Sequence, residues 1–246
     1  MKVRTYFSAA EAEGVLVAGA TAVVIDVIRA TSTIVEALAN GARAIYPTVS
    51  TEEAIRLANS LGRDDTLLCG ERKGLKVEGF DLGNSPREFS GEKVRDKRLV
   101  MSTTNGTRAF VAAQGADEVL AASFLNLGSV VRRMAGSTDE AVLICAGKED
   151  RFSLDDALCA GILLRELLED HDASDVPVLN DASRAALHLA RTFELHEELL
   201  RATAAGAALV EVGLGDDLAL CAQRDRHDLV PEMNDRMIHL PRASES

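Results

Sequence analysis

The sequence predicts a three-layer α/β/α protein with a largely parallel or mixed sheet and a smaller C-terminal α/β unit packed on it. Apolar runs of strand length recur up to Cys145, and helical patterns separate them. Parallel strands need crossover connections that pack on the sheet, so this alternation favours a parallel arrangement. An Ala- and Leu-rich stretch begins after about residue 178. We predict a main domain over 1–177 and the smaller unit over 178–246, joined without a flexible linker.

The predicted elements follow one another in a regular order along the chain. Apolar runs predict strands over 22–28, 44–47, 66–69, 99–102, 118–121 and 141–145. Helical patterns lie over 33–39, 52–61, 107–113, 124–134, 155–168 and 181–208. Thr33 with Glu36 and Ser50 with Glu53 have the spacing of capping boxes, which predicts where two of the helices begin.

The composition is that of an ordinary globular protein, with a net charge of −12 over 246 residues. This charge opposes binding to nucleic acid or to an anionic membrane surface, so we expect neither partner. Any anionic substrate must then be met by a local basic cluster or a metal ion. No apolar run approaches the ~18 residues of a membrane span, and the N-terminal residues lack the apolar stretch of a signal peptide. We therefore expect a cytoplasmic protein.

Polar and charged residues collect where the predicted strands end. Asp26, Arg29 and several hydroxyl residues follow the first of these strands, and similar loops over 70–86, 102–108 and 146–148 follow three later ones. Because the carboxyl ends of parallel strands share one edge of a sheet, where ligands bind, we expect these loops to meet. Carboxylates can bind a metal ion, and basic side chains, hydroxyls and the exposed backbone N–H groups of glycine-containing loops can bind an oxyanion. Together these groups suit a metal ion and an oxyanion that are bound side by side.

Each of these clusters also has a purely structural interpretation. The carboxylate of Asp26 can accept a backbone N–H in a turn, and the hydroxyls at 31–33 can cap a helix. Residues 103–106 have the composition of a tight turn, because Asn-Gly tolerates positive φ. The basic residues between 72 and 76 can form a solvated loop, and the acids at 155–156 suit any helix N-terminus. The residues alone leave both interpretations open.

Motifs for several other chemistries are absent from the sequence. There is no Walker A loop, no GxGxxG after a strand and no GxSxG elbow. The four cysteines form no CxxC pair, and the five histidines have no HxH or HExxH spacing. Ile28 stands where a haloacid-dehalogenase-type phosphatase carries its second Asp. These absences disfavour zinc, histidine-based and dinucleotide chemistry.

Several segments of the chain form a joint pattern that is more specific than any one of them. The segments are 26–33, 70–72, 79–86, 103–107, 145–147, 153–156 and the tail from 213 to 231. Together they resemble the 2-phosphosulfolactate phosphatase family over nearly the whole chain. That family usually has Glu and then Asp where Asp155 and Asp156 stand, so only Asp156 carries over unchanged.

The resemblance implies a Mg²⁺-dependent phosphoric monoester hydrolase with an α/β fold. Its expected reaction is the hydrolysis of (R)-2-phospho-3-sulfolactate to 3-sulfolactate and phosphate, a step toward coenzyme M. A related phosphorylated hydroxy acid is the other expected substrate. The partner is thus a small anionic phosphorylated molecule, and the resemblance also suggests a homodimer.

Under this hypothesis, carboxylates form the metal site. Asp26 binds magnesium together with Asp81, and with Glu78 or Asp156, through hard oxygen ligands. Glu71 orients the attacking water. The sequence leaves open whether Asp26 is instead a covalent nucleophile.

The remaining loop residues are expected to bind the substrate. Arg29 and Arg108 hold phosphoryl oxygens, and Arg72 or Lys76 meets the carboxylate or sulfonate. The other predicted substrate-binding residues are Thr31, Ser32, Asn84, Ser85, Thr103, Thr104, Asn105, Gly106 and Thr107. Two rival functions stay open: a non-catalytic phosphometabolite-binding protein, and a phosphotransferase or lyase that acts on a similar substrate.

Overall fold

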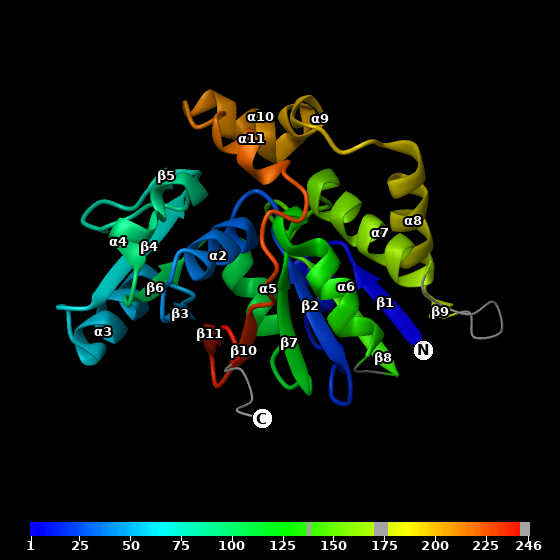
Figure 1. Cartoon of the computed structure of the whole chain (residues 1–246), viewed down its shortest axis with the longest axis horizontal. Helices are drawn as coiled ribbons and strands as arrows, with labels where there is room; N and C mark the ends of the chain where they lie inside the picture. The colour runs from blue at the N-terminus through cyan, green and yellow to red at the C-terminus, as the bar shows by residue number, and fades with distance from the viewer. Residues whose placement is uncertain (137–138, 170–176, 242–246) are drawn as a thin grey trace.

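The computed structural model describes residues 1–136, 139–169 and 177–241, and it confirms the three-layer α/β/α architecture (Figure 1). Within these residues one mixed sheet runs in the order β5-β4-β6-β3-β11-β10-β7-β2-β8-β1-β9. The strands are β1 Lys2–Tyr6, β2 Thr21–Ile25, β3 Ala44–Pro47, β4 Thr66–Arg72, β5 Leu75–Lys76, β6 Arg98–Ser102, β7 Glu118–Ala122, β8 Glu140–Cys145, β9 Val178–Leu179, β10 Glu232–Asn234 and β11 Met237–His239. Every strand predicted from an apolar run is present.

Two parallel blocks make up most of the sheet, and a C-terminal hairpin joins them. Strands β4, β6 and β3 form one parallel block, and β7, β2, β8, β1 and β9 form the other. The hairpin β10–β11 pairs antiparallel with β7 on one side and with β3 on the other. Strands from the predicted C-terminal unit therefore complete the main sheet. Residues 170–176, just before the predicted boundary at 177, lie outside the described residues.

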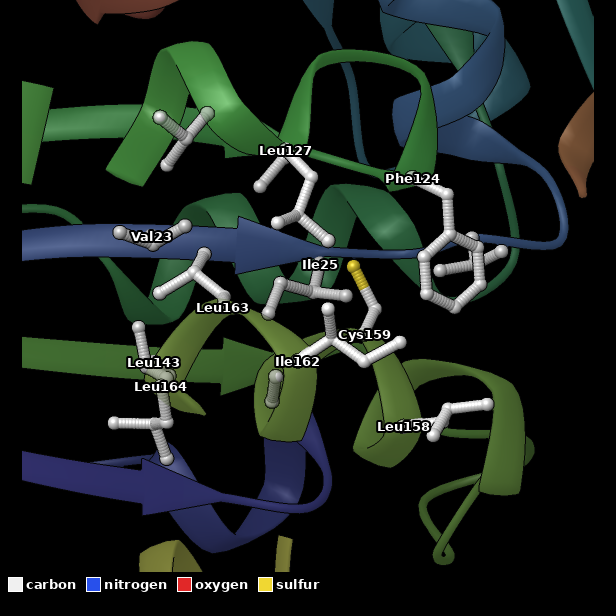
Figure 2. Packing of buried hydrophobic residues seen from close by; sticks show 14 of the residues in the cluster. Val23, Ile25, Phe124, Leu127, Leu143, Leu158, Cys159, Ile162, Leu163 and Leu164 are labelled. Carbon is white, nitrogen blue, oxygen red and sulfur yellow. The ribbon is translucent and has the colours of Figure 1, made fainter. Parts of the chain in front are cut away.

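Helices cover both faces of this sheet. They are α1 Ala9–Ala12, α2 Ala30–Ala39, α3 Thr51–Leu61, η1 Pro86–Glu88, α4 Gly91–Val94, α5 Gly106–Ala112, η2 Phe124–Asn126, α6 Leu127–Ala135, α7 Leu154–Glu169, α8 Asp181–Thr192, α9 Glu197–Ala202, α10 Ala204–Glu211 and α11 Asp217–Cys221. Alternate residues of β2 face opposite sides: Val23 and Ile25 pack toward α6 and α7 (Figure 2), whereas Val24 packs with residues of α1 and α5. Burial on both faces explains why such strands are continuous apolar runs.

Two helix starts were predicted from capping patterns, and one of them is wrong. Ser50 accepts the backbone N–H of Glu53 at 3.1 Å and starts α3 as expected. Helix α2, in contrast, already begins at Ala30, so Thr33 lies inside it. The Thr33 hydroxyl instead donates to the carbonyl oxygen of Asn84 at 2.9 Å, which ties α2 to the loop before η1.

The predicted continuous helix over 181–208 is also wrong, because α8, α9 and α10 divide this stretch. At the end of α8, Phe193 has an extended backbone with φ −103° and ψ 134°. His196 and Thr203 then begin α9 and α10 as N-cap residues whose side chains accept backbone N–H groups. Gly206 lets α10 approach α9 closely, since a Cβ there would lie 1.9 Å from a carbonyl oxygen of α9.

Helices α9, α10 and α11 lie together above the edge of the sheet, and we call these three helices the cap (Figure 1). The chain enters the cap from α8, which packs on α7 and β1, and leaves it toward the hairpin β10–β11. Within the described ranges no helix has the length and apolar character needed to cross a membrane.

Candidate active site

A cavity of about 450 Å³ lies between the cap and the loops that follow β2, β4, β6 and β8. The loops and the start of α7 form its floor, and α10 forms its roof. The polar floor residues are Asp26, Arg29, Glu71, Lys73, Asn84, Thr103, Thr104, Asn105, Lys148, Glu149, Ser153, Asp155 and Asp156, and the roof contributes Ala205, Ala208, Leu209, Glu211 and Val212. The polar loops that the sequence singles out therefore meet at one edge of the sheet.

Asp26 stands directly after β2, and the first two residues of α2 hold it in place. Its Oδ1 accepts the N–H of Ala30 at 3.1 Å, and the Thr31 hydroxyl bonds to both the N–H and the carbonyl of Asp26. Gly106 lies against its other oxygen, because a Cβ on Gly106 would be 2.8 Å from Oδ2. A non-proline cis peptide joins Ile28 and Arg29 in the same loop. The side chain is thus both a turn cap and a wall of the cavity.

Two more carboxyl groups enter the cavity from the N-terminus of α7. Asp156 accepts the N–H of Val27 at 2.8 Å and that of Gly147 at 3.0 Å, so it joins the loops after β2 and β8. Asp155 accepts the hydroxyl of Ser153 at 2.5 Å. Both acids are buried, with exposed fractions of 2%.

Burial raises the pKa values of all three carboxyl groups. The pKa of Asp26 rises from 3.8 to about 7, chiefly because of burial and further because Asp155 and Glu71 lie nearby. Burial likewise raises the pKa of Asp155. It raises the pKa of Asp156 well above its usual range, and the charges of Asp155 and Asp26 act in the same direction. A cation beside these buried acids would favour their ionised forms.

A divalent cation fits this donor set. Carboxylate oxygens are the hard ligands that Mg²⁺ prefers, and the ion usually binds through one or two carboxylates, several waters and substrate phosphate. No three His, Cys, Asp or Glu side chains among the described residues form a ready-made ligand cluster. Asp26 with one of the two acids of α7 supplies the one or two carboxylates that such a site needs.

An unpartnered polar atom in the cavity wall gives a second sign of a ligand site. Asn84 is buried, and its Oδ1 has no hydrogen-bond partner among the described residues. A buried polar group without a partner is costly, and in native proteins it commonly marks a place where water, an ion or a ligand binds. Asn84 therefore retains its predicted place at the site.

Glu71 links two loops of the floor. Its Oε1 accepts the N–H of Thr104, and its Oε2 accepts the N–H of Gly74, each at 2.8 Å. The carboxylate thus joins the end of β4 to the loop after β6 and to the β4–β5 turn. Each of its oxygens retains a lone pair that the two backbone bonds do not use.

Three basic side chains face the cavity. Arg29 donates to Asp217 of α11 and to the carbonyl of Gly74, at 2.7 Å each. Lys148 donates to the carbonyl of Ala204 at the start of α10, at 2.9 Å. Lys73 lies at the tip of the β4–β5 turn. These cations are the local positive charge that a protein of net charge −12 needs to bind an anion.

The structure brings together about half of the residues predicted for the site. The predicted residues on the cavity wall are Asp26, Arg29, Glu71, Asn84, Thr103, Thr104, Asn105 and Asp156. The wall does not include Thr31, Ser32, Ser85, Gly106 and Thr107. The hydroxyls of Thr31 and Ser32 turn back to carbonyl oxygens at the end of β2, and that of Ser85 donates to Asp217. These hydroxyls support the wall instead of forming it.

Five predicted residues lie away from the cavity, and each has a local reason. They are Arg72, Lys76, Glu78, Asp81 and Arg108. Strand β4 continues into a hairpin with β5, which carries Lys76 and Glu78 to exposed positions.

The other three side chains outside the cavity have protein partners. Arg72 donates to the hydroxyl of Ser102 at 2.9 Å. Asp81 accepts the N–H of Leu68 at 2.7 Å and pairs with an exposed arginine. Arg108 pairs on the surface with two acids. The predictions that these groups share one ion or one phosphate with Asp26 therefore need correction.

The site residues assigned from the sequence leave out several residues of the cavity wall. Lys73 and Lys148 stand within loops that it singled out, and Asp155 precedes a predicted ligand, so a signal for all three was present. The apolar roof residues gave no signal, because Ala, Leu and Val in a helix indicate packing.

Comparison with known proteins identifies the group to which this chain is related. A family model described as 2-phosphosulpholactate phosphatase matches residues 6–236. A protein of Clostridium beijerinckii, named probable 2-phosphosulfolactate phosphatase, is 37% identical over 238 residues, which cover 97% of this chain and 99% of that protein. The chain belongs to the 2-phosphosulpholactate phosphatase family.

Other members of this family carry the same name. One from Caldanaerobacter subterraneus is 39% identical, with 88% of each chain covered, and one from Thermotoga maritima is 39% identical, with 87% of this chain and 88% of that protein covered. The resemblance predicted from the motifs is therefore confirmed. In this member of the 2-phosphosulpholactate phosphatase family, segments 26–33, 103–107 and 153–156 of the motif pattern contribute residues to one cavity.

Proposed function

We propose that this protein is a Mg²⁺-dependent phosphatase that hydrolyses (R)-2-phospho-3-sulfolactate to 3-sulfolactate and phosphate. A related phosphorylated hydroxy acid is the alternative substrate. One observation carries the proposal: Asp26, Asp155 and Asp156 are buried in the same cavity as Arg29 and Lys148. Hydrolysis of a phosphate monoester depends mainly on positioning and on neutralising charge, and this cavity has the groups for both.

The carboxylates are the groups proposed to hold magnesium. Asp26 and Asp156 stay proposed ligands, and Asp155 joins them, whereas Glu78 and Asp81 are not among the residues that line the cavity. Bound Mg²⁺ would supply Lewis-acid neutralisation of charge on the phosphoryl oxygens. The pKa of Asp26, about 7 in the protein alone, would then fall, because a neighbouring cation favours the ionised form.

The other residues of the cavity would bind and orient the substrate. Arg29 has three N–H groups beyond those used by Asp217 and Gly74, and these are proposed to hold phosphoryl oxygens. Lys73 and Lys148 are proposed to meet the carboxylate and sulfonate. Arg72, Lys76 and Arg108 were predicted for these tasks but lie outside the cavity.

Glu71 remains our candidate for orienting the attacking water. Its two backbone bonds fix the carboxylate without using all of its lone pairs, so a water molecule has an acceptor at a defined place. The apolar roof of Ala205, Ala208, Leu209 and Val212 would exclude other water from the cavity.

Phosphate release from a small substrate panel tests the proposal. The panel contains phosphosulfolactate, phospholactate and phosphorylated sugars, each with Mg²⁺ and with EDTA. We expect release that needs water and Mg²⁺, that EDTA abolishes, and that is fastest for the phosphorylated hydroxy acids. Binding without turnover would indicate a phosphometabolite-binding protein. Release only with an added acceptor would indicate a phosphotransferase, and loss of phosphate with formation of a double bond would indicate a lyase.

Three further expectations accompany the proposal and stay predictions. The reaction would be a step toward coenzyme M if phosphosulfolactate is the natural substrate. A homodimer is testable by light scattering of the purified protein. The cytoplasmic location is testable by fractionation of the source cells.

A further inference from the structure

A buried ion pair connects the floor of the cavity to the cap. Arg29, in the loop after β2, donates from Nη1 to Oδ2 of Asp217 at 2.7 Å. Asp217 begins α11 and stands 188 positions further along the chain. The two side chains are only 3% and 1% exposed. This contact therefore reaches from the cap to a cation on the cavity wall.

Three hydrogen bonds fix the geometry of the pair. The other oxygen of Asp217, Oδ1, accepts the hydroxyl of Ser85 at 2.6 Å. Arg29 also donates from Nη2 to the carbonyl of Gly74 at 2.7 Å. A guanidinium is a planar fork, so two bonds from its two terminal nitrogens set its plane and direction. Among the described residues these are the only two hydrogen bonds of the guanidinium, and Arg29 is one of the residues that line the cavity.

Stability alone is a weak reason for such a pair. The desolvation of two buried charges commonly offsets their attraction, and apolar residues of similar volume are often as stabilising. The neighbouring residue Asp216 forms an ordinary surface ion pair: it is 81% exposed and pairs with Arg87 at 3.1 Å. Asp217, by contrast, is buried and holds a residue of the site.

We propose that Asp217 is a positioning residue that orients Arg29 toward the phosphoryl group, with Ser85 as its support. This inference rests on the proposed function in one respect, since it takes the cavity as the site of a phosphate. It makes α11 part of the site, although no residue of α11 lines the cavity. The cap then contributes the apolar roof from α10 and the orientation of a floor cation from α11.

Two substitutions of Asp217 separate positioning from other roles. In Asp217→Asn, the amide oxygen can still accept from Arg29 and the amide N–H can donate to Ser85, so the geometry is kept while the charge is lost. Asp217→Ala removes both bonds. If Asp217 positions Arg29, the Asn variant keeps its affinity for inorganic phosphate within about threefold of the wild type, and the Ala variant loses about tenfold or more. If Asp217 acts only through its negative charge, the two variants lose the same affinity for phosphate.

The probe is inorganic phosphate with Mg²⁺, titrated calorimetrically into the full-length protein. Loss of folded protein lowers the binding stoichiometry, whereas loss of positioning raises the dissociation constant. Asp216→Ala is the matched control one residue away, and its affinity should equal that of the wild type. In the Arg29→Gln background, Asp217→Ala should cause no further loss, because the two residues act as one unit.

Several results would overturn the inference. They are unchanged affinity in Asp217→Ala, equal losses in the Asn and Ala variants, a full additional loss in the Arg29→Gln background, and a wild-type protein that does not bind phosphate. If Asp217→Ala does not fold, Ser85→Ala replaces it with an expected loss of about threefold, and unchanged affinity there overturns the inference as well. Because phosphate binding needs no turnover, the absence of phosphatase activity would refute the proposed function while this test still decides the role of Asp217.

Discussion

Replacing Asp26 by Asn is expected to stabilise the metal-free protein at about pH 8 while it abolishes turnover. Asp26 is 6% exposed and lies near two other buried acids, and its pKa rises from 3.8 to about 7. The folded protein thus holds this proton more tightly than the unfolded chain does. By linkage, this group lowers the free energy of unfolding progressively as the pH rises from 3.8 to about 7, and the loss is complete above that range.

The size of the effect follows from the pKa difference. One pKa unit corresponds to about 1.4 kcal/mol, so a rise from 3.8 to about 7 implies a penalty on the order of 4 kcal/mol when Asp26 is ionised. The Asn side chain carries no charge, and its Oδ1 can still accept the N–H of Ala30. For a chain of this length, each kcal/mol shifts the melting temperature by ~2–4 °C, so the variant should melt roughly 8–16 °C higher.

Thermal melts with EDTA at about pH 8 and at about pH 4 measure this difference, which should nearly vanish at the lower pH. Added Mg²⁺ should stabilise the wild type more than the variant, because only the wild type offers the Asp26 carboxylate. Asp64→Asn, an exposed acid, serves as the control and should change neither melt. An Asp26→Asn variant that melts at or below the wild-type temperature at about pH 8 in EDTA would refute the reasoning.

Three further substitutions test the placement of other residues. Gly106→Ala puts a Cβ 2.8 Å from Oδ2 of Asp26, so kcat should fall about tenfold or more in a phosphate-release assay, and an unchanged kcat would contradict the packing. Lys148→Ala should raise KM about tenfold for a substrate with a carboxylate and a sulfonate, but much less for a simple phosphate monoester; equal effects on both would remove its proposed role. Asp81→Asn should keep kcat and the Mg²⁺ dependence within about twofold, while the weakened bond to Leu68 lowers stability by about 1 kcal/mol in denaturant melts.

The sheet was predictable where strands are buried on both faces. After their first residue, strands β2, β7 and β8 are continuous apolar runs, because helices cover both of their sides. Strand β1 alternates buried with more exposed residues and lacks such a run. Strands β10 and β11 have three residues each, too few to form a pattern, and their place between β3 and β7 depends on pairing with distant strands.

The location of the site was predictable, but the direction of each side chain was not. Ligands bind at the carboxyl ends of the strands in an open α/β sheet, and this rule identified the loops that form the cavity. It could not show that the hydroxyls of Thr31 and Ser32 turn back to the backbone, since serine and threonine bond readily to nearby carbonyls. The hairpin β4–β5 likewise decides that Lys73 faces the cavity while Lys76 does not. That hairpin depends on two bridge pairs that no sequence pattern specifies.

The structural and functional interpretations of Asp26 turn out to be the same arrangement. The bond from the Ala30 N–H that makes Asp26 a turn cap also directs its other oxygen toward Gly106 and the cavity wall. A helix N-terminus thereby holds in place a carboxylate that burial alone would drive to take up a proton.

The charges around the cavity explain why a cation and a phosphorylated anion would need each other. The wall carries the acids Asp26, Glu71, Glu149, Asp155, Asp156 and Glu211 against the bases Arg29, Lys73 and Lys148. With every group ionised, the acids outnumber the bases by three, and the wall would repel an anionic substrate. A bound divalent cation would offset two of these three negative charges, so an anionic phosphoryl group would be repelled less. Because linkage is reciprocal, the bound phosphoryl group would in turn raise the affinity of the site for the cation. A site with few carboxylate ligands is then sufficient, since oxygens of the substrate would supply further ligands.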